Sequence, residues 1–138
     1  MNTRTTLITD WRVRDEDALP DVPPGEEYER VITPQKHVAL RQILVNDLCL
    51  VCLKIGAVEV PFELASTDGA LRIYRPAHAK FDSVLSARFD AHRAAMARMP
   101  IAGDEIAVMA ALDVRLTLRN NGDVSAKPRA SLLAREEI

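Results

Sequence analysis

Two stretches of the chain alternate strictly between apolar and polar residues, and a period of two is typical of a β-strand with one buried face. Apolar residues occupy every even position from Leu112 to Leu118, between charged and hydroxyl side chains. The pattern recurs at residues 58–64, where Pro61 lacks an N–H group and therefore predicts a strand at a sheet edge. Residues 48–55 are almost continuously apolar, as in a strand buried on both faces. A β-sheet with an apolar core is expected.

Turn residues connect these stretches to further strands. Ser66-Thr67-Asp68-Gly69 predicts a turn, after which residues 71–75 return as an antiparallel neighbour. The Asn121-Gly122 pair predicts a tight hairpin with a return strand through residues 124–126. The other segments are predicted as short strands at 5–13 and 28–32, a helix or a strand at 35–47, and a short helix as one option at 104–111.

One long helix is predicted between Pro76 and Pro100. Alanine is abundant there, and seven side chains recur at spacings of three and four. The stripe comprises Phe81, Val84, Leu85, Phe89, His92, Met96 and Met99. We therefore expect an α+β fold in a single domain: an antiparallel or mixed sheet of about five to seven strands, packed by one long amphipathic helix at about 77–99.

The N-terminal residues are acidic. Eight Asp and Glu side chains lie between Asp10 and Glu29, against only two arginines, and residues 19–25 contain three prolines and a glycine. We interpret residues 1–27 as an arm anchored by Trp11, either solvated or docked on a basic partner or on the chain's own basic half. Residues 28–127 are then the α+β globular domain, and residues 128–138 a C-terminal tail.

Length and composition exclude several classes. A chain of 138 residues with 48% hydrophobic residues is long enough to bury its own core as one domain. Its longest apolar runs fall far short of the roughly 20 residues of a membrane-spanning helix, and the N-terminus lacks the apolar stretch of a secretory signal, so a cytoplasmic location is expected. The five glycines are too far apart for a phosphate-binding loop, and no cofactor is expected.

Cys49 and Cys52 form a C-x-x-C motif within an apolar run. On a regular strand, residues three apart point to opposite faces and cannot bind one ion. Since redox-active pairs need an exposed, electropositive position, we expect buried structural thiols and no metal site, although whether the thiols are only structural stays open.

Five residues are candidates for a pocket or an interface. His92 lies in the apolar stripe of the predicted helix, either as a core residue bonded to a backbone carbonyl or in a pocket between helix and sheet. His78 precedes Asp82 by four residues, a spacing that permits a carboxylate-oriented imidazole, but nothing marks a nucleophile. Tyr74 between Arg72 and Arg75 could contact nucleic acid, which the 4% aromatic content and the net charge of −2 disfavour. Adjacent acids such as Asp104-Glu105 are interpreted as solvated turn charges.

The sequence contains no recognisable set of catalytic residues. Whether the protein is an enzyme stays open, with a non-enzymatic role favoured. The favoured hypothesis is a cytoplasmic binding or assembly module of bacterial or phage type. We expect it to be homo-oligomeric because edge strands must be paired or covered, with a protein partner for the acidic arm as a further option. The alternatives are a small enzyme or ligand carrier with a pocket between helix and sheet, and a nucleic-acid-contacting regulator. The partner or substrate, the pathway and the oligomer number stay open.

Overall fold

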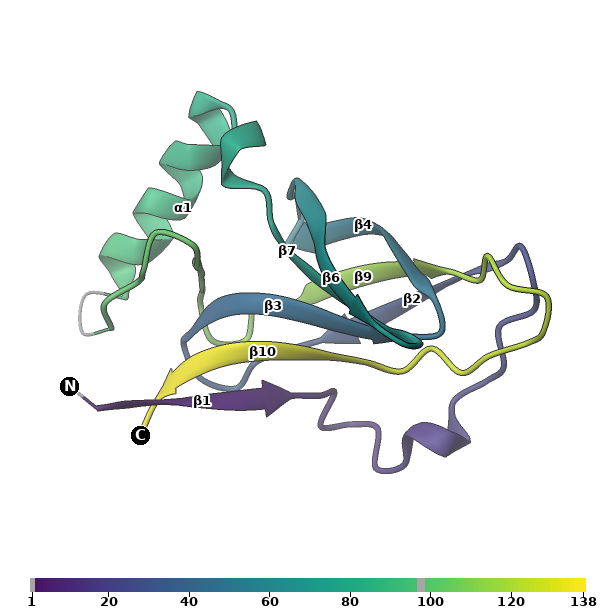
Figure 1. The fold of residues 1–138 in the computed structure, drawn as a ribbon. Coiled ribbons are helices and arrows are strands. Elements are labelled where there is room, and N and C mark those ends of the chain that lie inside the picture. The colour runs from purple at the N-terminus through teal and green to yellow at the C-terminus, as the bar shows by residue number, and fades with distance from the viewer. Residues whose placement is uncertain (1, 97–98) are drawn as a thin grey trace.

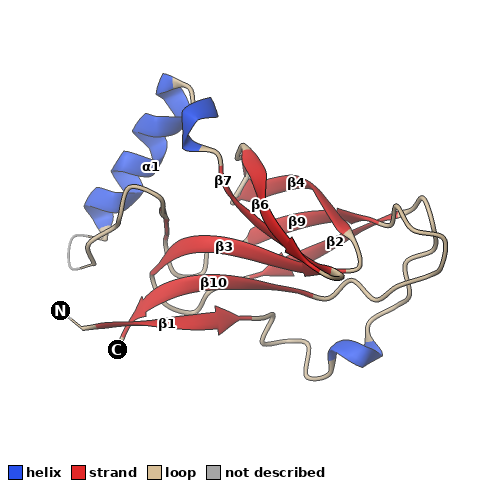
Figure 2. Cartoon of the chain, viewed as in Figure 1, coloured by secondary structure: helices blue, strands red, loops and turns tan. Residues whose placement is uncertain are grey.

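Ten strands form two antiparallel sheets in the computed structural model, which describes residues 2–96 and 99–138 (Figures 1 and 2). The first sheet has the strand order β1 (Thr3–Ile8), β10 (Ala130–Glu137), β3 (Val38–Asn46), β7 (Leu71–Pro76) and β6 (Phe62–Asp68), and β8 (Ile106–Val108) also pairs with β3. The second sheet has the order β2 (Glu27–Ile32), β9 (Val114–Arg119), β4 (Cys49–Ile55) and β5 (Val58–Glu59).

The core lies where inward side chains of the two sheets meet. The alternation predicted around Leu116 is confirmed in β9, whose three even positions are fully buried. They belong to one buried cluster with Ile43 of β3, Leu53 of β4 and Leu132 of β10. The apolar face of a sheet must be covered by another element, and here the apolar faces of the two sheets cover each other.

The hairpin predicted at Asn121-Gly122 is wrong. Strand β9 already pairs with β2 on one edge and β4 on the other, so no edge is left for a return strand. The buried Asn120 side chain instead donates hydrogen bonds to the carbonyls of Val22 and Val124, and Ala126 forms only an isolated bridge with Val22. A side chain that satisfies backbone groups across a loop replaces the tight turn.

The strand predicted at residues 58–64 is divided at Pro61. Its first part, β5, pairs with β4 in the second sheet, and its second part, β6, pairs with β7 in the first sheet. Because proline donates no ladder hydrogen bond, it stands where the chain passes between the sheets. The predicted β6–β7 pairing is confirmed, with Gly69 at a φ of 60° in the turn.

The structure decides one segment for which the sequence left two alternatives, and it differs from the expectation for two others. Residues 35–47, left open, form strand β3, in which Val38, Ala39 and Leu40 are buried in succession because the strand is covered on both faces. The short helix considered at 104–111 is strand β8 instead. The expected C-terminal tail is β10, which is hydrogen-bonded on both edges, to β1 and to β3.

The helix is shorter than predicted. Helix α1 spans Ser83–Ala95, capped by Asp82, and a 3-10 turn η2 (His78–Lys80) precedes it. Residues 97 and 98 of the predicted helix lie outside the described residues. Within α1 only Phe89 is buried, and Val84 is 72% exposed. Figure 1 shows α1 at one end of the molecule, beside the segment that carries β8, instead of lying across a sheet face. The coarse α+β assignment holds, but the helix does not cover the sheet.

No helix in the described ranges is long and apolar enough to cross a membrane.

Candidate functional site

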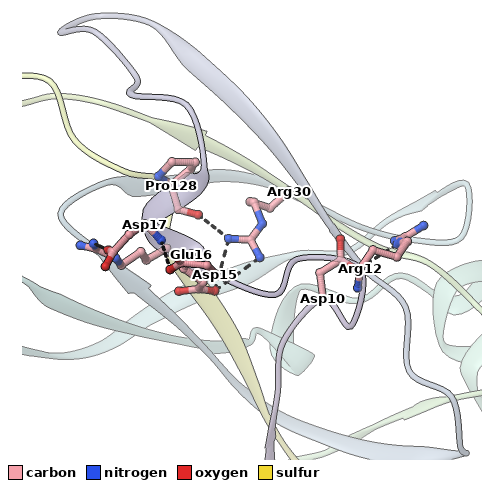
Figure 3. Close-up of polar contacts among 8 residues, drawn as sticks. Asp10, Arg12, Asp15, Glu16, Asp17, Arg30 and Pro128 are labelled. Atoms are coloured by element: carbon pink, nitrogen blue, oxygen red, sulfur yellow. Dashed lines mark hydrogen bonds and ion pairs between the residues drawn. The ribbon is translucent and has the colours of Figure 1, made fainter.

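The acidic arm docks on basic residues of its own chain (Figure 3). The 3-10 turn η1 (Glu16–Ala18) places Asp17 against Arg129, and Asp21 lies 3.2 Å from the Lys127 ammonium. Asp10 pairs with Arg12 within the arm at 2.9 Å. Lys127 and Arg129 lie within residues 70–138, the half of the chain in which Lys and Arg outnumber Asp and Glu. Of the two docking partners considered for the acidic arm, the structure therefore contains the chain's own basic half.

Arg30 is a buried residue that contacts the arm. It lies on the inward side of β2, its side chain is 2% exposed, and its Nη1 donates to the Pro128 carbonyl at 2.7 Å. The nearest carboxylate, Glu16, is 3.5 Å away. Sequence reasoning missed this buried charge, although the signal was present: Arg30 alternates with Tyr28 and Ile32, so a strand that buries the latter also buries Arg30.

Strand β1 is an open edge of the first sheet. Ile138 N donates to Asn2 O, which identifies even-numbered residues of β1 as the hydrogen-bonded partners of β10. The N–H and C=O groups of Thr3, Thr5 and Leu7 therefore point away from β10, and no described strand pairs with them. An unpaired row of this kind is a template for another strand.

Large apolar side chains lie next to this open edge. Leu7 is 60% exposed and Trp11 is 61% exposed. Trp11, which was predicted to anchor the arm, lies on the surface with the Arg12 guanidinium 5.7 Å from its ring centroid. Both side chains border a hollow of about 370 Å³ that also includes Pro34 and Lys36. An exposed tryptophan beside an exposed leucine is typical of an interaction surface.

The three candidate residues of β7 do not form one surface. Tyr74 is buried, and its hydroxyl accepts a hydrogen bond from Leu50 N at 3.1 Å; burial raises the pKa of that hydroxyl. Arg72 donates to the Leu48 carbonyl, and Arg75 pairs with Glu63 at 2.8 Å on the exposed face. The structure thus uses Tyr74 in a contact with β4 of the second sheet, Arg72 in a contact with the β3–β4 connection and Arg75 in an ion pair with β6.

The two candidate histidines flank Phe89 without forming a catalytic pair. The His92 ring packs edge-on against Phe89, 5.4 Å between centroids, and its buried Nδ1 makes no hydrogen bond to any described residue, so the expected bond to a carbonyl is not formed through this atom. The His78 ring packs against Phe81 at an interplanar angle of 37°, with 4.8 Å between the ring centroids. Asp82, considered as its carboxylate partner, accepts from Leu85 N as the helix cap.

A groove of about 580 Å³ lies between the N-terminal half of α1 and the corner where the chain passes from β5 to β6. Pro61, Phe62, Val84 and Leu85 are among its apolar lining, and its charged residues are balanced, two basic (Lys80 and Arg88) and two acidic (Glu59 and Asp82). Neither candidate histidine lines it. A pocket near the helix was predicted, but the residues that form this one were not.

Glu105 is a second buried charge that the sequence reasoning missed. It was interpreted as a solvated turn residue, yet it is 1% exposed. Its carboxylate accepts from Ala102 N at 2.8 Å and from Arg135 Nη2 at 2.6 Å, and Arg41 lies at 3.5 Å. Burial raises its pKa, but the hydrogen bonds from Arg135 and Ala102 outweigh burial and hold the pKa below its usual range. This network ties the β8 segment to β10 and β3.

The cysteines lie on the outer face of the second sheet. Strand β4 has a bulge between Leu50 and Cys52, so that Cys49 pairs with Arg119 and Cys52 with Thr117. Directly opposed residues share a face, and Arg119 and Thr117 are two apart, so both thiols lie on one face. The prediction that they point to opposite faces is wrong, because it assumed a regular strand. Both are free and half-buried.

The comparisons with family models, with curated proteins and with solved structures found no match for this chain. The described residues also contain no cluster of three or more His, Cys, Asp and Glu side chains arranged to hold a metal ion. The function is therefore argued from the surfaces described above.

Proposed function

We propose that this chain is a non-enzymatic cytoplasmic assembly module that associates with a second copy of itself through the open edge of β1. The observation that carries the proposal is the coincidence of that edge with the exposed Leu7 and Trp11. An unpaired strand alone is a liability that proteins blunt with charge or proline, and an exposed apolar patch alone has many uses. Together they supply both the hydrogen bonds and the apolar contact that strand addition requires.

The geometry of β1 is compatible with a two-fold pairing. The backbone N–H and C=O groups that point away from β10 belong to the odd-numbered residues of β1. Two antiparallel β1 strands can therefore pair with Thr5 opposite Thr5 of the partner subunit. In that register Leu7 faces Thr3 of the partner subunit, and Arg4 faces Thr6 of the partner subunit. Threonine pairs are favourable across strands, and like charges do not oppose each other directly.

The opposite edge of the same sheet provides a natural comparison. Strand β6 is also terminal in the sheet and carries the exposed Leu64. Both edges carry an ion pair to the neighbouring strand, Arg4–Glu136 at β1 and Glu63–Arg75 at β6, so charge does not distinguish them. Strand β6 differs in its bulge, which interrupts the regular edge between Leu64 and Ser66. Because a bulge discourages strand addition, β1 is the edge expected to pair.

Native mass spectrometry and sedimentation velocity across a wide micromolar range test the proposal. We expect a dimer in the wild-type protein. Leu7→Lys should weaken it at least tenfold, which is about 1.4 kcal/mol, by replacing an apolar contact with a charged side chain. Thr5→Pro should do the same by removing an N–H that points across the two-fold. The hydrogen bonds of β1 to β10 should survive, because they come from the even-numbered residues.

Leu64→Lys is the matched control, an identical substitution on the other edge strand, and should leave the dimer unchanged. A wild-type monomer at every concentration would refute the proposal, as would a dimer that persists in both β1 variants.

The groove beside α1 supports a second candidate, a carrier of a small apolar ligand, because its volume lies within the usual range for ligand pockets. A small molecule retained by a monomeric wild-type protein in the same spectra would favour this candidate.

A further inference from the structure

The bulge in β4 converts the C-x-x-C segment from two separated thiols into neighbours. Cys49 and Cys52 align with Arg119 and Thr117, which are two positions apart on β9. Two positions along a strand span roughly 6.7 Å, so this is the spacing of the two cysteines along the sheet. The extra residue, Val51, is accommodated in the bulge.

This spacing suits a bridging ion better than a disulfide. A disulfide needs Cβ atoms about 3.5–4.5 Å apart, whereas parallel Cα–Cβ bonds on one face keep them near the Cα spacing. Two thiolates on one metal ion, with metal–sulfur bonds of about 2.3 Å, are about 4.6 Å apart when the ion lies on the line between them. The Cys49 side chain interacts with the Tyr74 hydroxyl, so its thiol must turn from Tyr74 towards Cys52 to reach that sulfur–sulfur distance, which it can do without moving the backbone.

The strand is held firmly at this point. Leu50, between the two cysteines, donates its N–H to the buried Tyr74 hydroxyl and packs its side chain into the core. Its neighbour across the ladder is Leu118, which is fully buried. A site built on such a fixed backbone requires little rearrangement when an ion binds.

Charged side chains of both signs surround the pair. Arg119 lies opposite Cys49 and pairs with Glu27, and Lys54 lies beyond Cys52, between Arg115 and Glu59. Two thiolates on a monovalent cation carry a net charge of −1, one unit less negative than two free thiolates, so the bound ion itself supplies the positive charge that this face does not. Burial raises the pKa of the Cys52 thiol and nearby Glu59 adds to the effect, so the Cys52 proton must leave when an ion binds at neutral pH.

We propose that Cys49 and Cys52 form a two-coordinate site for a soft monovalent cation of the copper(I) type on the outer face of the second sheet. Copper(I) prefers thiolate ligands and accepts two of them, whereas zinc requires four ligands. Binding forms two metal–sulfur bonds, breaks two S–H bonds and releases two protons to water, with no change in oxidation state. The inference does not depend on the proposed assembly.

The test uses reduced, full-length protein under anaerobic conditions, with copper(I) supplied as the complex of a coloured chelator. We expect one copper per chain, withdrawn from the chelator with release of two protons. X-ray absorption should show two sulfur neighbours and no third ligand. Cys49→Ser and Cys52→Ser should each reduce the affinity at least a hundredfold, with unchanged circular dichroism.

A relocated thiol provides the matched control. The double variant Cys52→Ser with Lys54→Cys keeps two cysteines on the same exposed face, but positions 49 and 54 align with Arg119 and Arg115, four apart, or about 13 Å. It should lose the one-copper complex within a single chain. The proposal is overturned if the reduced wild-type protein does not compete with the chelator, or if the relocated variant binds copper(I) as tightly as the wild type.

Discussion

Replacing Glu105 with glutamine tests whether the buried carboxylate holds the β8 segment to the sheet. The substitution keeps the size of the side chain and its ability to accept from Ala102 N, and it removes the charge that Arg135 and Arg41 face. Removing one partner of a buried ion pair costs about 3–5 kcal/mol. The arginine side chains are 21% and 41% exposed and can regain water, so we expect the lower end, about 3 kcal/mol.

The pH dependence gives a sharper test of the same reasoning. The pKa of Glu105 is lower in the folded protein than in the unfolded chain, because the hydrogen bonds from Arg135 and Ala102 outweigh burial. Its contribution is therefore fully present above the unfolded pKa of about 4.3 and is lost as the pH falls through the folded value. The stability difference between the wild type and Glu105→Gln should be constant near neutral pH and shrink below about pH 4.3.

Urea unfolding followed by circular dichroism at a series of pH values measures both effects. In thermal unfolding at pH 7, the melting temperature of Glu105→Gln should be roughly 10 °C below that of the wild type. Asp104→Asn is the control, since this neighbouring carboxylate is exposed and should change stability by less than about 0.5 kcal/mol. A Glu105→Gln variant as stable as the control at pH 7 would refute the network, and so would a difference that stays constant as the pH falls to 3.

Two further predictions concern the backbone and the arm. Gly56 and Gly69 both have φ near 60°, but an added Cβ meets Leu112 Cδ1 at 3.0 Å only at Gly56. In thermal unfolding, Gly69→Ala should cost about 1 kcal/mol and Gly56→Ala about 2; equal costs would contradict the crowding at Leu112. Arg30 is a buried cation with a carboxylate no closer than 3.5 Å, so Arg30→Met should lie within about 1 kcal/mol of the wild type, whereas Arg30→Ala should cost 2 kcal/mol or more in urea unfolding. A strong loss in the methionine variant would show that the polar contacts of Arg30, with Glu16 and with the Pro128 carbonyl, stabilise the fold more than its packing does.

Local pattern was sufficient for most of the strands. The alternation around Leu116 and the apolar run at residues 48–55 each predicted a strand that the structure contains. The turn before residue 71 predicted the β6–β7 pairing. These features depend on neighbours in sequence, since the period of the side chains specifies which face is buried whatever the strand pairs with.

Local pattern failed where a segment depended on a distant partner. Residues 130–134 read Ala-Ser-Leu-Leu-Ala, without the strict alternation of β9, and their position after Pro128 led to the prediction of a tail. They form a strand because β3 and β1 offer them two edges. The predicted hairpin at Asn121-Gly122 failed for the opposite reason, because both edges of β9 were already occupied.

The candidate surfaces follow the same division. The sequence by itself determined that Cys49 and Cys52 lie in a buried-type strand and that the arm is acidic. Only the tertiary structure decided that a bulge brings the thiols to one face, that the arm's carboxylates meet Arg129 and Lys127, and that Trp11 is exposed. The physical reason is that a bulge, an ion pair between distant segments and an open strand edge each depend on pairing register, which long-range contacts set and local periodicity does not specify.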